Sequence, residues 1–131
     1  MIILDTSVWI EFLRARPDYF GEVKMLLDGR MIIGLECIFG ELLQGTRNPR
    51  ERDIVESYWR DLPKMDEAGI WLEAGRISSE GRLHARGVGL IDCAILAAAR
   101  KSGAKIWTLD RKLAEILSGN EKYIARSVID E

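Results

Sequence analysis

Short apolar runs alternate along the chain with longer stretches in which apolar residues recur every three or four positions. The runs at 2–4, 31–33 and 104–109 have the length and the β-branched or aromatic content of buried strands. Helical spacing covers residues 8–13, about 21–27, 35–44, 49–62, most of 66–85, 91–100 and 111–117. Strands separated by helices are typical of the α/β class. We therefore predict one α/β domain over residues 1–131, with a small, mostly parallel sheet flanked by helices on both faces.

Two of the predicted strands end on an aspartate that leads directly into a helix. Asp5 follows the first strand and Asp110 follows the last. Open α/β sheets bind ligands at the carboxyl ends of their strands, and adjacent strands lie about 4.8 Å apart. We therefore expect Asp5 and Asp110 to be neighbours at one edge of the sheet. Thr6 and Ser7 are expected to cap the first helix with their hydroxyl groups.

Two further acids lie on helices that are otherwise largely apolar. Glu41 lies at the edge of an inward-facing stripe, and an ordinary solvated glutamate is the alternative interpretation. Asp92 is the only acid of the helix at 91–100, in a first turn where the helix dipole alone would favour an anion. A carboxylate that enters an apolar core is unusual. We therefore interpret Asp92 as functional and keep Glu41 as a candidate.

Glycine and proline mark boundaries between the predicted elements. Residues 16–18 are expected to form a turn, and Pro49 is a preferred first residue of a helix. Gly81 weakens the helical pattern of residues 66–85, so a kink or break is expected there. The tail at 122–128 is expected to add an edge strand.

The composition indicates a folded, soluble domain. The 131 residues are 47% hydrophobic and 31% charged, as in globular proteins. No apolar run is long enough for a membrane span, and Asp5 interrupts the apolar start, unlike a signal peptide. We therefore expect a cytoplasmic protein without a membrane partner. The net charge of −2 does not decide for or against a nucleic acid, because a carboxylate cluster offsets a basic surface elsewhere.

The cysteine and aromatic side chains are assigned to the core. Cys37 and Cys93 lack the spacing of zinc ligands, and His84 is the single histidine. We therefore expect buried, reduced thiols and no zinc site. The large aromatic residues are also assigned to the core: Trp9, Phe12, Trp59 and Trp71.

If the four acids converge, their charges require a counter-ion. Carboxylates that lie close together cannot all remain ionised without one. Oxygen ligands favour a hard divalent cation, Mg²⁺ or Mn²⁺. Such an ion can activate water and stabilise charge during displacement at a phosphodiester. Basic residues around the rim would then contact backbone phosphates, and the candidates are Arg47, Arg50, Arg86, Arg111 and Lys112.

Four motifs around these acids resemble, in the same order, those of the PIN-domain family, and in particular the small VapC-type toxins of type II toxin–antitoxin systems. The resemblance spans nearly the whole chain. The motifs are Leu4-Asp-Thr-Ser-Val-Trp-Ile10, Gly40-Glu-Leu-Leu-Gln-Gly45, Leu90-Ile-Asp-Cys-Ala-Ile-Leu-Ala-Ala-Ala99 and Thr108-Leu-Asp-Arg111.

The resemblance implies a metal-dependent endoribonuclease with Asp5, Glu41, Asp92 and Asp110 as its catalytic residues. Asp5 and Asp92 match the main metal ligands. Asp110 matches an acid that assists directly or through water, and Glu41 one that acts through a water on the metal. Thr6 and Ser7 match hydroxyl residues that support the first acid.

The resemblance also implies partners. These are an RNA substrate, a second copy of the chain in a homodimer, and a cognate antitoxin whose tail blocks the acidic groove. Many members of the family carry a further acid two residues after the fourth. Lys112 stands at that position here, which leaves the number of metal ions open.

Two other functions remain open from the sequence. A PIN-like module could bind RNA or a protein partner without cutting, although all four acids are present. A phosphohydrolase of the haloacid-dehalogenase type also begins with an aspartate after a short strand. That chemistry needs a second acid two residues later, where this chain has Ser7.

Overall fold

The computed structural model describes residues 1–126, in which helices surround two short strands. The strands are β1 (Ile2–Leu4) and β2 (Lys105–Trp107). The helices are α1 (Thr6–Leu13), α2 (Pro17–Asp28), α3 (Glu36–Gln44), α4 (Pro49–Asp61), α5 (Ile70–Gly81), the 3₁₀ turn η1 (His84–Arg86), α6 (Leu90–Ser102) and α7 (Arg111–Ile116).

The sheet is parallel and small. β1 and β2 pair with Ile3 opposite Ile106. Single parallel bridges extend this pair on both sides, namely Ile2 with Ile32, Gly34 with Lys64, and Ile106 with Lys122. Five short segments are thus joined edge to edge, with β1 and β2 at the centre. The α/β class expected from the sequence is confirmed.

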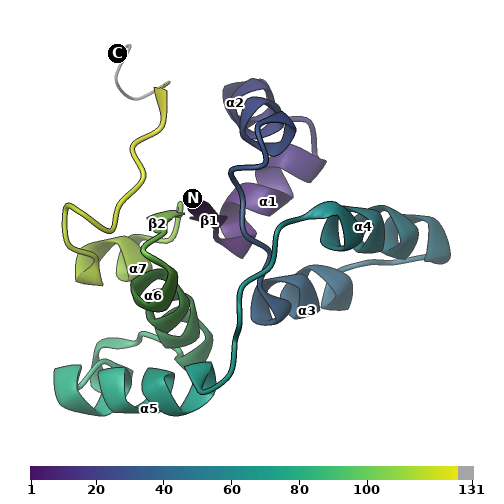
Figure 1. Cartoon of the computed structure of the whole chain (residues 1–131). Helices are drawn as coiled ribbons and strands as arrows, with labels where there is room; N and C mark the ends of the chain where they lie inside the picture. The colour runs from purple at the N-terminus through teal and green to yellow at the C-terminus, as the bar shows by residue number, and fades with distance from the viewer. Residues whose placement is uncertain (127–131) are drawn as a thin grey trace.

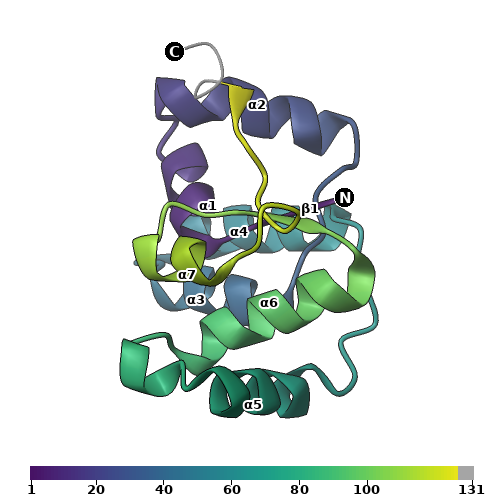
Figure 2. The same cartoon turned by 90° about the vertical axis from the view of Figure 1, so that its left-hand side faces the viewer.

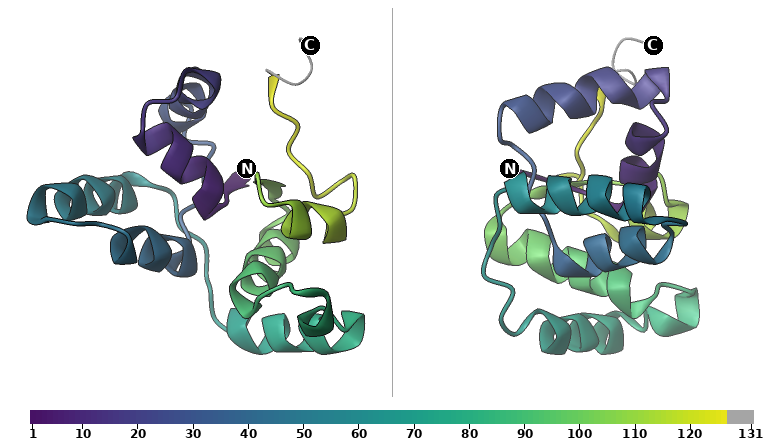
Figure 3. Two further views of the ribbon diagram at one scale, coloured as in Figure 1. Left: turned by 180° about the vertical axis from the view of Figure 1, so that it is seen from behind. Right: turned by 90° about the vertical axis from the view of Figure 1, so that its right-hand side faces the viewer.

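The helices form layers on both sides of the strands. Helices α1 to α4 lie on one side and α5 to α7 on the other, with β1 and β2 between them (Figures 1 and 3). α6 is the central helix, because it contacts β2, α3 and α5, and α5 runs alongside it (Figure 2). Its residues 93–99 are all buried, which explains the unbroken apolar run in this part of the sequence.

Aromatic rings fill the space between α1, α3 and α4. Trp9 meets Phe39 edge to face, with ring centroids 5.2 Å apart, and Phe12 meets Tyr58 in the same way at 5.6 Å. Such pairs add stabilisation beyond the apolar area that they bury. The core assignment is confirmed for Trp9 and Phe12, whereas Trp71 lies on the surface with 50% of its area exposed.

Two predicted helix starts are wrong. Residues 16–18 do not form a separate turn, because α2 begins at Pro17, whose missing N–H costs nothing at the first helical position. At α1 the N-cap is Asp5, and no side chain donates or accepts a capping bond there. Thr6 and Ser7 lie inside the first turn instead, which frees their hydroxyl groups for the contacts described below.

The segment at 66–85 breaks where glycine is placed. Gly69 adopts a left-handed conformation (φ +79°) directly before α5, so the helix begins four residues later than expected. It ends at Gly81, and η1 follows separately. In the tail, Lys122 does bridge to Ile106, and residues 127–128 of the expected edge strand lie outside the described residues.

Two remaining expectations concern the thiols and the membrane. Cys37 and Cys93 are both free, as expected; Cys93 is buried, also as expected, whereas Cys37 is only partly buried. Burial is the main reason that the pKa of Cys37 rises to about 12, so this thiol stays protonated at neutral pH. None of the helices within residues 1–126 combines the length and the hydropathy that a bilayer span requires.

Candidate active site

Asp5 is held at the end of β1 by two hydroxyl groups. It is the one charged side chain that is buried in the described part of the chain, with 6% of its area exposed. Its Oδ2 accepts hydrogen bonds from Ser7 Oγ at 2.9 Å and from Thr108 Oγ1 at 2.7 Å. Its Oδ1 accepts no hydrogen bond from the described residues. Every fully buried side-chain oxygen in this part of the chain has a partner, so Oδ1 must be accessible to solvent. Oδ1 is therefore open to a ligand.

The two hydroxyl groups are themselves oriented by the loop after β2. Ser7 Oγ accepts a bond from the backbone N–H of Leu109 (3.0 Å), and Thr108 Oγ1 accepts one from Asp110 N–H (2.9 Å). Because each oxygen already accepts from an amide, its own proton is free to point at Asp5. The strand and the loop, about a hundred residues apart in sequence, are thus joined at a single carboxylate oxygen.

Glu41 lies beside this pair on α3. Its Oε1 accepts a hydrogen bond of 2.7 Å from Thr6 Oγ1, the residue after Asp5. The side chain is partly buried, so it is not the freely solvated helix glutamate that the sequence left open. Helix α3 also contacts α6, which brings Glu41 towards the helix that carries Asp92.

Asp92 shares an electrostatic environment with the other three acids. Burial is the largest cause that raises its pKa, to about 6, and the charges of Asp110, Asp5 and Glu41 raise it further. The backbone N–H of Gly89, the N-cap residue of α6, acts in the opposite direction. Asp5 and Asp92 therefore do not point to opposite faces of the molecule, since the charge of Asp5 acts on the carboxyl of Asp92.

Asp110 has a second, purely structural contact. It is the N-cap of α7, and its Oδ1 accepts the backbone N–H of Lys112 at 2.9 Å. This bond satisfies one of the amide groups left unpaired at a helix start. One carboxylate oxygen of Asp110 is therefore used within the helix, while its charge still acts on Asp92.

The four carboxylates supply the oxygen ligands that a hard cation prefers, but they do not lie close enough together to coordinate one ion. Oxygen donors of one charge suit Mg²⁺ or Mn²⁺. Among the ion pairs between described residues, none involves Asp5, Glu41, Asp92 or Asp110. No three acidic, histidine or cysteine side chains in this part of the chain lie close enough to hold one ion together. A bound cation would therefore have to draw the carboxylates inward.

A groove of about 830 Å³ runs from Glu41 between α1, α3 and α4. Apolar side chains, among them Ile10 and Leu13, line it together with the cations Arg14, Arg47 and Arg50. The groove therefore presents both apolar surface and positive charge next to one of the four acids.

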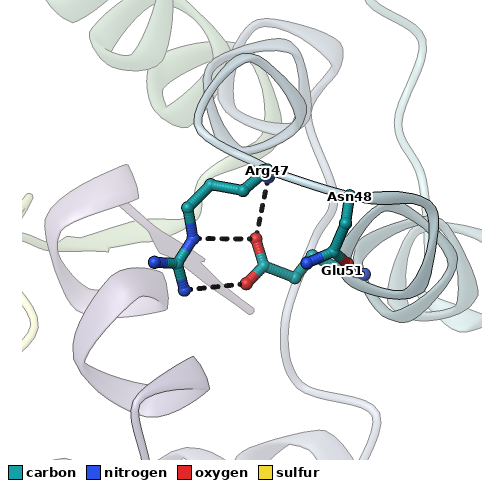
Figure 4. A network of polar contacts seen from close by, with 3 residues as sticks. All are labelled: Arg47, Asn48 and Glu51. Carbon is teal, nitrogen blue, oxygen red and sulfur yellow. Dashed lines mark hydrogen bonds and ion pairs between the residues drawn. The ribbon is translucent and has the colours of Figure 1, made fainter.

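Arg47 is already engaged at the rim of this groove. Its guanidinium lies against the carboxylate of Glu51, with Nη2 at 3.1 Å from Oε2, and its backbone N–H donates to the same carboxylate at 2.8 Å (Figure 4). Asn48 Oδ1 in turn accepts the N–H of Glu51, which caps α4. Of the rim cations expected from the sequence, Arg47 is thus the one that forms an ion pair with another described residue.

Sequence reasoning missed Thr108 as a site residue. Thr108 lies two residues before Asp110, in a motif that had drawn attention only to its acid. Its bond to Asp5 joins residues 103 positions apart, and local spacing carries no signal of such a contact. The hydroxyl groups of Thr6 and Ser7, in contrast, are recognisable from their positions next to Asp5.

Comparison with known proteins extends over nearly the whole chain. The sequence model of the PIN domain matches residues 2–117. Ribonuclease VapC32 from Mycobacterium tuberculosis is 34% identical over 130 residues, which cover 98% of this chain and 99% of the relative. Ribonuclease VapC11 from the same species is 33% identical over 118 residues, covering 81% and 84%.

A solved structure has the same fold. It is the crystal structure of VapBC2 from Rickettsia felis bound to a DNA fragment from their promoter, with a TM-score of 0.66 and 22% sequence identity. The match covers 93% of this chain and 96% of that one. With the family match and the full-length similarity to VapC ribonucleases, the chain belongs to the PIN-domain family, in its VapC group.

Proposed function

We propose that this protein is a metal-dependent endoribonuclease that acts as the toxin of a toxin–antitoxin pair. Relatives that match 98% and 81% of this chain are named ribonucleases, and the family resemblance implied the same activity. The observation that carries the proposal is the shared field of the four acids, in which the charges of Asp5, Glu41 and Asp110 all raise the pKa of Asp92. A cluster of this kind gains most from a divalent cation.

Asp5, Asp92 and Asp110 would hold the cation, and Mg²⁺ and Mn²⁺ both suit their oxygen atoms. When bound, such an ion supplies an activated water and stabilises negative charge on the phosphodiester. Ser7 and Thr108 keep Asp5 Oδ2 in place, and Oδ1 accepts no hydrogen bond from the described residues. Thr6 fixes one oxygen of Glu41, so its other oxygen is available to orient or deprotonate a water molecule.

The groove beside Glu41 suits the partners that the family implies. Its mixture of apolar residues and arginines suits RNA, whose bases and phosphates need both kinds of contact. It also suits a peptide segment of an antitoxin, by analogy with the VapBC2 complex. A homodimer stays a prediction from the resemblance, which light scattering of the purified protein would test.

The direct test replaces each main acid by its amide. Asp5→Asn and Asp92→Asn should each lower Mg²⁺-dependent cleavage of RNA by at least about a hundredfold, because the proposed ligand loses its charge. Expression of either variant should also no longer inhibit growth. Asp53→Asn, at an exposed position of α4, is the matched control and should retain wild-type activity. Circular dichroism should report the same helix content for all three variants.

The outcomes separate the alternatives left open by the sequence. Cleavage by Asp5→Asn or Asp92→Asn at the wild-type rate would overturn the mechanism. Metal-independent RNA binding without any product would favour a non-catalytic binding module. Turnover of a small phosphomonoester, lost in Asp5→Asn, would favour a phosphohydrolase instead.

A further inference from the structure

Lys112 extends from one acid of the site towards the segment that carries another. Its backbone N–H is bonded to Asp110 Oδ1 at 2.9 Å, which fixes the start of its side chain. The chain of methylene groups then crosses to Gly87, where Nζ lies 2.7 Å from the point that a β-carbon would occupy. The β-carbon of any other residue at position 87 would occupy the space in which the ammonium group of Lys112 lies. We call this space beside Gly87 the seat of the ammonium group.

The seat lies in the loop before α6. Gly87 follows η1 in a left-handed conformation (φ +79°), and two residues later Gly89 begins the helix with its N–H acting on Asp92. The lysine therefore bridges the start of α7, with Asp110, and the start of α6, with Asp92. Its ammonium group lies beside the loop that leads to Asp92.

The ammonium group does not act as the counter-ion of the acids. Within the described residues no carboxylate lies in salt-bridge distance of Lys112, whereas Arg47 is paired with Glu51. The positive charge of Lys112 is thus not neutralised by a carboxylate of the described residues, so it is available to an anion that approaches the site.

We propose that Lys112 is a substrate-binding residue, whose ammonium group, seated on Gly87, contacts a backbone phosphate of the RNA beside the four acids. This inference rests on the proposed function. Of the five rim cations named from the sequence, Lys112 is the one to which this inference assigns a phosphate contact. An ammonium at this point offsets the repulsion between the incoming phosphate and the carboxylates.

RNA binding without metal tests the contact separately from catalysis. The probe is a short fluorescein-labelled single-stranded RNA, titrated in EDTA and followed by fluorescence anisotropy. At about 0.1 M salt, Lys112→Ala should weaken binding by about five- to tenfold, and the dependence of log Kd on log salt concentration should fall by about 0.7. Lys112→Arg should restore both values, since it keeps the charge.

Lys24→Ala is the matched control, because Lys24 lies exposed on α2 and is paired with Asp28 at 3.8 Å. It should bind RNA as the wild type does. Equal affinity and equal salt dependence for Lys112→Ala and Lys24→Ala would overturn the inference. In cleavage assays Lys112→Ala should raise KM more than it lowers kcat, a division that simple loss of stability does not produce.

Gly87→Ala tests the seat itself. A β-carbon there would meet Nζ at 2.7 Å and push this flexible end of the side chain aside, so the variant should weaken RNA binding, but by less than Lys112→Ala does. In the double variant Gly87→Ala/Lys112→Ala the two effects should not add, since the lysine is already gone. The positive φ strains alanine in both backgrounds, and thermal melts monitor this shared cost. Fully additive losses would show that Gly87 does not seat the lysine.

The two proposals fail in different ways. Undiminished cleavage by Asp5→Asn would overturn the mechanism, whereas the metal-free binding data on Lys112 would stand by themselves. Loss of cleavage in Asp5→Asn together with unchanged RNA binding by Lys112→Ala would overturn only the inference about Lys112.

Discussion

A single carboxylate oxygen, Asp5 Oδ2, accepts hydrogen bonds from residues near both ends of the chain. Ser7 and Thr108 both donate to it, and backbone amides after β2 occupy the acceptor side of each hydroxyl. The direction of both protons is therefore fixed before any ligand arrives. Such outer contacts orient a ligand atom and tune its affinity for a metal.

Thr108→Val tests this orientation at constant side-chain shape. The variant removes one donor to Asp5 and leaves the N–H of Asp110 without its partner. We expect the affinity for Mn²⁺, measured by isothermal titration calorimetry, to fall about 10- to 100-fold. Thr108→Ser keeps the hydroxyl and should recover most of the affinity. An unchanged Mn²⁺ affinity in Thr108→Val would contradict a positioning role.

At the scale of single elements, Asp110 combines a helix cap with a charge that acts on Asp92. Asp110→Asn keeps the oxygen that caps α7 but loses the charge, whereas Asp110→Ala loses both. We expect both variants to cleave RNA about tenfold or more slowly, and only Asp110→Ala to lose about 1 kcal/mol of unfolding free energy. Denaturant unfolding and cleavage rates are the two measurements. Wild-type activity in Asp110→Asn would reduce this residue to a cap.

The elements that the sequence predicts well are those with a strong local signal. The apolar run of α6, the proline start of α4 and the acid directly after β1 are all visible in a few neighbouring residues, whereas β2 ends at Trp107, three residues before Asp110. The errors arise where tertiary contacts decide. Thr6 and Ser7 look like helix caps, yet their hydroxyl groups bond to Glu41 and Asp5, and Lys64 joins the sheet through one bridge without a strand pattern.

At the scale of the whole molecule, the site exists only because distant segments meet. Its acids come from the ends of β1 and β2 and from α3 and α6, which lie on both sides of the sheet (Figure 1). The order of the acids is readable from the sequence. The distance from Lys112 to Gly87 and the bond from Thr108 to Asp5 are not, because neither follows from a local period or motif.

The convergence of four acids should make the metal-free protein sensitive to pH. In the folded state the pKa of Asp92 is raised from 3.8 to about 6, by burial first and then by its three acidic neighbours. A raised pKa means that the protonated carboxyl favours folding. This contribution is fully present below the unfolded pKa and is lost as the pH rises through about 6.

Asp92→Asn should therefore be more stable than the wild type at pH 7.5 in EDTA, by about 1 kcal/mol once solvent screening of this half-buried group is allowed for. The difference should shrink towards pH 4, where the wild-type carboxyl is neutral. Urea unfolding at both pH values measures it. At pH 7.5, Mg²⁺ should then stabilise the wild type, because it binds the folded state, and should have little effect on Asp92→Asn. Parallel pH profiles of the two proteins would mean that Asp92 does not feel the other acids, and the shared site would lose its electrostatic basis.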